Sequence, residues 1–499
     1  MKIICNISFI LFCAISINGS AQNIELGSLL NQDARNSQLL NGKDSLKSFA
    51  IQSTEVNSNA KSSFFYWKAL PISFINQYNS HHPYGYNDGP MIPASGYQSL
   101  LSAGLYAKAG PLQLQLQPQY IYASNVHYEQ NAQYGYSNNK PYKKLFPGQS
   151  SISLNMSAIS IGLSTQNLWW GPGITSALLM SNNAPGFEHI YLKTSHPIKT
   201  PIGSFEFQLI GGRLQNDTAM PYENFHLKPN SNIANNGRYT NGYVLSYHPK
   251  WVPGLFLGIN RSLNRYENEI SKGTNSFFSK YLPILGKTLQ KKNDWGDDTL
   301  NTDQLASFFI RWVMPKSKAE FYVEYGFNDY GANTRDYLMA PTHSSTHVIG
   351  FKKIKPLNKT SYLDFNVEIT QLSQSPDAIL RSAGNWYVHG QIRQGYTHYN
   401  QILGAGAGYA ANKQIMSAIW VNGYTKLGIL LERTDRDPEY HGNKWIDLSV
   451  GLLPQVKYKN YIIGGAVQLI NSSNYMWEKD LTKLNFHSKI SIQYLFHSK

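Results

Sequence analysis

The alternation of short and long connections between predicted strands is the feature that most constrains the fold of this chain. From Phe64 onward the hydrophobic residues follow a two-residue period, which is typical of β-strands with one apolar face. The clearest case is residues 112–122, where glutamines alternate with leucines and tyrosines. One face carries Leu112, Leu114, Leu116, Tyr120 and Tyr122, and the other carries Gln113, Gln115, Gln117 and Gln119. A polar ladder of this kind suits a barrel wall that faces a wet lumen.

The same period predicts eighteen strands and a regular alternation of their connections. The strands lie near residues 64–78, 97–108, 112–124, 150–156, 159–169, 187–196, 203–215, 238–248, 254–264, 304–313, 319–328, 344–354, 361–372, 416–423, 426–434, 445–457, 461–470 and 485–496. The connection after every even strand is short, and the connection after every odd strand is longer. Short turns on one side and long loops on the other are typical of an outer-membrane barrel. The predicted fold class is therefore all-β, a transmembrane antiparallel outer-membrane β-barrel of about eighteen strands.

A large soluble β-sandwich or propeller is the alternative fold, but it would not place every long connection on one side. The exact strand ends stay open in two regions, 150–170 and 373–415. At Ser157-Ala158 the apolar positions move from even to odd numbers, and a tight turn there explains the shift. In the long connection after residue 264, the spacing of apolar residues predicts a short helix over 276–291.

The composition fits a barrel with a polar interior. Charged residues make up only 15% of the chain, yet the mean hydropathy is −0.36. Tyrosine and glycine replace many of the charged residues that a typical soluble protein would have, with 34 Tyr and 39 Gly. No stretch after the N-terminus reaches the roughly 18 apolar residues that a spanning helix needs. The net charge of +14 suits lipopolysaccharide phosphates or acidic glycans better than nucleic acid in an exported protein.

The N-terminus has the layout of a secretory signal. Lys2 precedes the apolar run 7–17, and the small residues 19–21 mark a cleavage point. We therefore expect a signal peptide over residues 1–21, a periplasmic N-terminal segment over 22–63, and the barrel over 64–499. Both cysteines, Cys5 and Cys13, lie inside the signal, so the exported chain is expected to have no thiol.

The densest cluster of aromatic, glycine and amide side chains lies in residues 167–186. Trp169 and Trp170 are followed by Gly-Pro-Gly, and Asn182 and Asn183 come shortly after. By the strand count this cluster ends the fifth strand at the outer mouth of the barrel. Alternation predicts Trp169 in the lipid-facing aromatic girdle, and Trp170 facing the lumen or the loops as a platform for a sugar ring. The alternative is a stiff corner, because Gly-Pro-Gly is ordinary turn chemistry.

Two carboxylates invite an enzymatic interpretation. Glu320 and Glu324 are four residues apart on one strand, so both face the lumen. Four strand residues span roughly 13 Å, which is too far for the carboxyl pair of a glycosidase. We expect them instead to pair with cations such as Arg213 or Arg311. No zinc motif, phosphate loop or nucleophile elbow is present, so neither a metal nor another cofactor is predicted, and the chain is not expected to be an enzyme.

Several short motifs, taken in order, resemble a known family. They are Asn79-Ser80 with Pro83-Tyr84-Gly85, Asn87-Asp88-Gly89, Gly96-Tyr97-Gln98, Trp169-Trp170-Gly171-Pro172-Gly173, Ser181-Asn182-Asn183-Ala184, Glu324-Tyr325-Gly326 with Asn328-Asp329, and Gly395-Tyr396-Thr397-His398. Together they resemble the Wzi-like capsule assembly family, and its Bacteroidetes-type members more than the enterobacterial ones. The resemblance implies an eighteen-strand outer-membrane barrel that acts as a lectin and helps to hold capsular polysaccharide on the cell surface. The turn and loop lengths support a barrel independently of this resemblance.

The leading functional hypothesis is thus a non-enzymatic barrel that binds surface polysaccharide and supports capsule assembly or attachment. The residues expected to contact the glycan are Trp169, Trp170, Asn182, Asn183, Arg213, Glu320, Glu324, Asp329, Tyr396 and His398. The expected partners are capsular or other surface polysaccharide together with outer-membrane lipids and lipopolysaccharide, with a monomeric barrel. The alternative is a passive or gated pore for small solutes. A third possibility, an outer-membrane hydrolase, lacks a recognisable catalytic cluster in the sequence.

Overall fold

The computed structural model describes residues 23–24, 29–42, 45–56, 64–129, 134–136, 140–217, 219, 222–224, 237–269, 302–328, 342–374, 384–436 and 442–496. The predicted signal peptide over residues 1–21, the predicted helix over 276–291 and the candidate site residue Asp329 lie outside these residues. Within the described residues, no helix is both long enough and apolar enough to cross a membrane.

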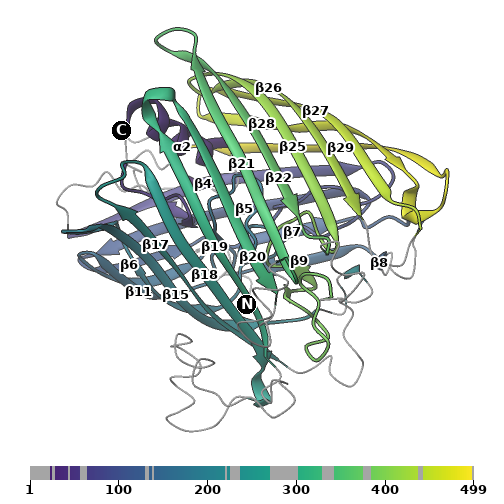
Figure 1. Cartoon of the computed structure of the whole chain (residues 1–499), viewed down its shortest axis with the longest axis horizontal. Coiled ribbons are helices and arrows are strands. Elements are labelled where there is room, and N and C mark those ends of the chain that lie inside the picture. The colour runs from purple at the N-terminus through teal and green to yellow at the C-terminus, as the bar shows by residue number, and fades with distance from the viewer. Residues whose placement is uncertain are drawn as a thin grey trace, which may run out of the picture.

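The described chain forms a closed antiparallel barrel of eighteen strands (Figure 1). Its strands are β4 (Phe65–Asn79), β5 (Gly96–Ala109), β6 with β7 (Leu112–Leu116 and Gln119–Ala123), β9 with β10 (Tyr142–Phe146 and Ser151–Met156), β11 (Ile159–Ser164), β13 with β14 (His189–Thr194 and Ile198–Thr200), β15 (Gly203–Leu214), β17 (Arg238–Pro249), β18 (Leu255–Tyr266), β19 (Asp303–Met314), β20 (Ala319–Asn328), β21 (Ser345–Pro356), β22 (Ser361–Gln371), β25 (Ala411–Asn422), β26 (Thr425–Arg436), β27 (Trp445–Tyr458), β28 (Tyr461–Ser473) and β29 (Thr482–Tyr494). The last strand closes on the first, with His487 opposite Asn79 and Tyr494 opposite Ile72. The predicted fold class is confirmed.

The smaller elements are not part of the wall. They are β1 (Asn23–Ile24), α2 (Leu29–Asn41), β2 (Ile51–Ser53), β3 (Glu55–Val56), β8 (Tyr134–Tyr136), β12 (Leu168–Trp170), β16 (Tyr222–Asn224), η2 (Glu267–Glu269), η3 (Pro315–Ser317), β23 (Thr397–His398), β24 (Gln401–Ile402) and η5 (Tyr475–Trp477). Among them, β2 pairs with β12, and β23 pairs with β24.

The hairpin predicted at Ser157-Ala158 is a two-residue turn. Met156 of β10 lies opposite Ile159 of β11, and Ser157 has a φ of 55°. Other strand ends differ from the prediction. The fourth strand also includes β9, whose Lys143 and Lys144 interrupt the apolar pattern. The fourteenth strand begins at Ala411 rather than near residue 416.

Alternation divides the wall into an apolar outer face and a polar inner face. In the glutamine ladder, Leu116 and Tyr120 are 49% and 43% exposed, whereas Gln115, Gln117 and Gln119 are buried. A water-filled lumen would leave these glutamines wet. They are buried because other parts of the same chain fill the lumen.

The hydrophobic core of this protein lies inside the barrel. Three inward segments, 80–95, 165–188 and 384–410, fold into the lumen together with β2. Side chains of segments 165–188 and 384–410 pack on inward-facing wall residues in one cluster, which includes Trp170, Leu178, Tyr191, Val244, Phe309, Tyr322, Val348, Trp386, Tyr387, Tyr396 and Ile402. Segment 80–95 packs in a second cluster, where Met91, Ile92 and Ala94 lie with wall residues Leu100, Ile121 and Phe146. This core makes the inward segments and the wall a single packed unit.

The helix α2 lies beside η3, which belongs to one of the short turns, and ion pairs attach it to the inner wall. Arg35 Nε is 2.6 Å from Glu320 Oε1, and Arg311 pairs with the other oxygen of the same carboxylate. Arg311 also donates to Ser48 O at 3.0 Å. Further along, Lys426 Nζ is 2.7 Å from Asp33 Oδ1. The described part of the N-terminal segment 22–63 therefore contacts the barrel interior, while its exposure to the periplasm stays a prediction.

The ion pairs of Glu320 with Arg35 and Arg311 are expected to stabilise the attachment of α2 to the wall. The substitution Glu320→Gln leaves Arg35 and Arg311 buried without their common anion, which typically destabilises a protein by about 3–5 kcal/mol. We expect a lower thermal unfolding midpoint in detergent and faster proteolysis within residues 29–56. The matched control is Glu267→Gln, because the Arg213–Glu267 pair is largely exposed and should change stability by less than about 1 kcal/mol. Equal effects of the two substitutions would contradict this role.

Candidate functional site

The segment 165–188 leaves the wall where β11 ends at Ser164 and turns into the lumen. Gly171 has a φ of 143°, and a Cβ atom there would lie 2.5 Å from Glu324 Oε2. Where the segment returns to the wall, a Cβ atom on Gly186 would lie 2.0 Å from Thr165 O. Glycine is therefore required at both positions, one for conformation and one for close backbone approach. The aromatic and glycine-rich cluster is a corner inside the barrel, and the prediction that it extends the fifth strand is wrong.

Both tryptophans of this corner are buried in the lumen. Trp170 is fully buried, and its Nε1 donates to Gln208 Oε1 at 3.0 Å. Its ring lies against Gly242, where a Cβ atom would be 3.1 Å away. Trp169 is 3% exposed and donates to Gly173 O at 3.2 Å. The expectation of Trp169 in the lipid-facing girdle is wrong, because β12 pairs with β2 rather than with the wall. Trp170 does face the lumen, but neither ring presents an open face.

Glu324, an inward carboxylate of the wall, holds the corner segment through neutral donors. Glu324 accepts from Ser307 Oγ at 2.7 Å, Asn260 Nδ2 at 3.2 Å and the backbone N–H of Leu178 at 3.2 Å. Glu320 pairs with Arg311 as predicted. For Glu324 the described partners are all uncharged, so the predicted cation is wrong. Arg213 lies on the outer face of β15, where its Nε is 2.8 Å from Glu267 Oε1.

Glu368 is a second inward carboxylate that holds the corner through neutral donors, and it was not among the predicted site residues. Its Oε2 accepts from the backbone N–H of Ile174 at 2.7 Å and from Tyr322 Oη at 2.7 Å. The alternation of β22, which also buries Asp364 and Thr370, was the signal that placed it on the lumen face.

Asn182 and Asn183 connect the three inward segments. Asn182 Nδ2 donates to Asn87 O at 3.1 Å, and Asn183 Nδ2 donates to Ile402 O at 3.2 Å. The other two predicted contacts, Tyr396 and His398, are 1% and 2% exposed. All four residues therefore lie inside the filled lumen, where Asn182 and Asn183 link the inward segments by hydrogen bonds.

His398 is a neutral acceptor in this arrangement. Its Nδ1 accepts from the backbone N–H of Gln215 at 3.0 Å. Burial lowers the pKa of His398 well below its usual range, and nearby Arg238 lowers it further. An imidazole in this state cannot supply positive charge to a ligand near neutral pH.

A polar network attaches segment 80–95 to the opposite wall. Tyr84 Oη donates to Glu432 Oε2 at 2.8 Å, and Tyr86 Oη donates to Glu432 Oε1 at 2.5 Å. Lys413 Nζ is 3.5 Å from Glu432 Oε1 and 3.1 Å from the centre of the Tyr86 ring. Burial, followed by the charge of Glu432, raises the pKa of both phenols well above the usual range. Both therefore stay protonated and remain hydrogen-bond donors.

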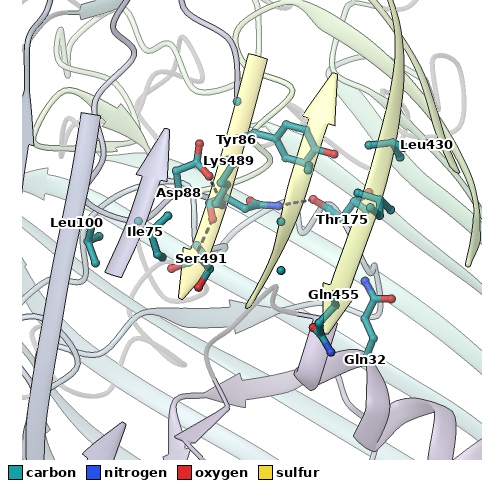
Figure 2. A pocket seen from close by; sticks show the side chains of 18 of the residues that line it. Gln32, Ile75, Tyr86, Asp88, Leu100, Thr175, Leu430, Gln455, Lys489 and Ser491 are labelled. Carbon is teal, nitrogen blue, oxygen red and sulfur yellow. Dashed lines mark hydrogen bonds and ion pairs between the residues drawn. The ribbon is translucent and has the colours of Figure 1, made fainter. Parts of the chain in front are cut away.

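Two cavities lie on either side of residues 85–88. The larger has a volume of about 290 Å³ and lies between this segment, Thr175 and strands β22 to β29, β4 and β5. Figure 2 shows some of its lining side chains, among them Tyr86, Thr175 and Leu430. The smaller has about 90 Å³ and reaches the long-loop end of β26 at Arg436. Gly85, Tyr86 and Asp88 line both. Asp88 is fixed in place by an ion pair with Lys489 (Figure 2).

A histidine, a serine and an aspartate meet at the outer end, but not in the order that hydrolysis requires. Ser472 Oγ donates to Asp447 Oδ1 at 2.6 Å, and His82 Nε2 is 3.2 Å from the same Oγ. In a serine hydrolase the imidazole takes the serine proton, and the carboxylate lies on the far side of the imidazole. Here the aspartate takes the serine hydrogen bond. Within the described residues, no group of three or more His, Cys, Asp and Glu side chains is arranged to hold a metal ion.

The closed wall with an apolar outer face defines an outer-membrane β-barrel protein whose lumen is filled by its own chain. Residues 101–463 match the family described as capsule assembly protein Wzi, which is more than half of the chain. The protein belongs to this family. That it is a Bacteroidetes-type member stays a prediction. A comparison with curated protein sequences found no significant match.

Solved structures agree with this assignment at the level of the fold. The chain is similar to Wzi of Escherichia coli, with a TM-score of 0.60 and 11% identity over 85% of this chain and 84% of that one. That protein is described as a carbohydrate-binding β-barrel involved in group 1 capsule assembly. Weaker matches include OccAB1 of Acinetobacter baumannii, with a TM-score of 0.44 and 9% identity over 86% and 96% of the two chains.

Because Trp170 is buried in the lumen core, we expect its removal to lower the stability of the barrel. Trp170→Ala should destabilise the barrel by about 3–5 kcal/mol, because it opens a cavity in the lumen core. Unfolding in detergent by guanidinium, followed by tryptophan fluorescence, measures this. Trp251→Ala is the matched control, since Trp251 is 70% exposed in a short turn. A Trp170→Ala variant of unchanged stability that lost only glycan binding would restore the platform hypothesis.

His82 predicts a pH dependence of stability. Burial lowers the pKa of His82 to about 4, whereas an unfolded chain has about 6.5. Above pH 6.5 both states are neutral, and this stabilisation is complete. As the pH falls from about 6.5 to about 4 the unfolded state binds the proton first, so stability is lost. His82→Gln should therefore flatten the fall of the thermal unfolding midpoint in that range. Parallel curves for the two proteins would contradict the assignment.

Proposed function

We propose that this protein binds a surface polysaccharide at the long-loop end of its barrel and supports assembly or attachment of a capsule. Family membership is the single observation that carries the proposal. The Escherichia coli relative, described as carbohydrate-binding, supports it through a shared fold. The expected partners are the polysaccharide itself and the surrounding lipids and lipopolysaccharide, with one barrel as the working unit.

The outer end of the lumen has suitable chemistry for sugars. The smaller cavity is lined by the ring of Tyr84, by the amides of Asn183 and Gln401, and by the cations Lys413 and Arg436. Aromatic rings pack on apolar sugar faces, and amides can both donate to and accept from hydroxyl groups. Both cations already have carboxylate partners, Glu432 and Asp447, so this end is not strongly charged.

The filling of the lumen favours a binding protein over a passive pore. A barrel of this size could enclose an aqueous channel if it were empty. Here the packed core, which includes Leu178, Tyr322, Val348 and Trp386, occupies the interior. Solute flow would require this core to move out of the barrel.

A non-enzymatic role is part of the proposal. Glu320 is held between two arginines, and Ser472 donates to Asp447 rather than to His82. These arrangements give neither a free general acid nor an activated nucleophile.

Loss of the gene tests the proposal directly. We expect the deletion strain to shed capsular polysaccharide into the medium, because the barrel that retains it is gone. Cell-associated and released polysaccharide are measured after gentle washing. A plasmid copy of the wild-type gene should restore retention, and the destabilised Trp170→Ala variant should restore less. Unchanged retention in the deletion strain, together with no binding of the purified protein to isolated capsule, would overturn the proposal.

A further inference from the structure

Four exposed lysines form an arc on one side of the short-turn end of the barrel. They lie in or beside three turns, which join β17 to β18, β19 to β20 and β21 to β22, and these six strands are consecutive neighbours in the wall. The lysines are Lys250, Lys316, Lys355 and Lys359, and we call this set the basic arc. The half-buried Lys318 and Lys353 lie at the same turns and add to the positive charge of this part of the rim.

The basic arc has no compensating negative charge beside it. No Asp or Glu occurs in residues 249–255, 314–319 or 353–361. The first carboxylates after the second and third turns are Glu320 and Asp364, which face the lumen and have cationic partners there. Within the described part of the chain, none of the four lysines of the arc forms an ion pair. This side of the rim therefore presents a local excess of positive charge.

Part of this positive charge faces the lipid rather than the lumen. In β21, Lys353 and Lys355 alternate with the buried Lys352 and Ile354, and so continue the outward face of Phe351. Their side chains therefore leave the wall on the same side as the apolar surface that meets the membrane. Lipid reaches these two side chains directly, whereas a macromolecule at the aqueous end of the barrel would have to pass the turn.

Exposed apolar residues mark the level of the membrane interface at these turns. Trp251 directly follows the first lysine of the arc, and Leu357 lies between the last two. Trp312, near the end of β19 that meets the second turn, is 47% exposed on the outer face. Tryptophan is common where acyl chains meet headgroups, and lysine side chains extend from that level toward water. The basic arc therefore lies at the height of the lipid headgroups.

We propose that the basic arc is a binding site for the phosphate groups of anionic phospholipids in the leaflet that surrounds the short turns. In outer-membrane barrels these turns lie on the periplasmic side. The lysines contact the headgroups, while Trp251 and Leu357 lie at the boundary with the acyl chains. An anionic lipid surface attracts clustered lysines, which a zwitterionic surface does not. This goes beyond the proposed function, because it concerns the end of the barrel opposite the long loops and assigns this part of the charge to phospholipid rather than to lipopolysaccharide or glycan.

Spin-labelled lipids test the site with the full-length protein reconstituted in phosphatidylcholine membranes. Electron spin resonance of labelled phosphatidylglycerol and labelled phosphatidylcholine measures the fraction of each lipid that is held at the protein surface. We expect phosphatidylglycerol to associate at least about threefold more strongly than phosphatidylcholine at low salt. The preference should disappear at about 1 M salt, where the Debye length is about 3 Å. Equal association of the two lipids at low salt would overturn the proposal.

Two triple variants locate the bound lipid. One carries Lys250→Gln, Lys355→Gln and Lys359→Gln, and should lower the preference for phosphatidylglycerol by at least about half. The matched control removes the same formal charge from exposed positions at the long-loop end and should keep the preference; its substitutions are Lys140→Gln, Arg393→Gln and Lys479→Gln. Heat-modifiable migration in gels checks that both variants are folded. An unchanged preference in the first variant, or an equal loss in both, would overturn the assignment to the basic arc.

Co-sedimentation with isolated peptidoglycan separates lipid from an acidic polymer of the periplasm. We expect the wild-type protein and the arc variant to co-sediment equally, because the arc is occupied by lipid. Binding to peptidoglycan that is lost with the arc lysines, in a protein without preference for phosphatidylglycerol, would overturn the lipid site in favour of the polymer. Neither result bears on the polysaccharide proposal, which is tested by binding of isolated capsule.

Discussion

A membrane-spanning sheet cannot leave backbone N–H and C=O groups unpaired in hydrocarbon, and this constraint governs the whole protein. It is met by pairing β29 with β4, which closes the wall and leaves no free edge. Closure then fixes the direction of every side chain, because alternate residues must face either lipid or lumen. Leu116 and Gln115 are adjacent in sequence, yet one meets the membrane and the other is buried inside.

The polar inner face in turn determines how the lumen is filled. Wall carboxylates accept hydrogen bonds from the inward segments: Glu320 from Arg35, Glu324 from Leu178 and Glu368 from Ile174. Each carboxylate would be costly to bury without these donors. Between the polar contacts, aromatic side chains such as Trp170 and Tyr322 form the hydrophobic core that the lipid-facing surface cannot provide. The wall and its filling therefore stabilise each other.

The wall was predictable from the sequence because its signals are local. A two-residue period identifies a strand, and the phase shift at Ser157-Ala158 identified a hairpin that the pairing of Met156 with Ile159 confirms. The position of the corner at Trp169 was not predictable in this way. Tryptophan is common both in membrane girdles and in cores, and the choice depended on pairing with residues 51–53, which are far away in sequence. The partners of Glu324 were missed for the same reason, since Leu178 reaches it only after the segment folds inward.

The central claim is that the chain fills its own barrel and acts by binding rather than by conduction. Single-channel recording of the full-length protein in planar bilayers tests this most directly. The account predicts no stable openings for the wild-type protein, because the packed core that includes Leu178, Tyr322 and Trp386 occupies the lumen. Large, long-lived openings of the wild-type protein, with permeation of small sugars, would contradict it.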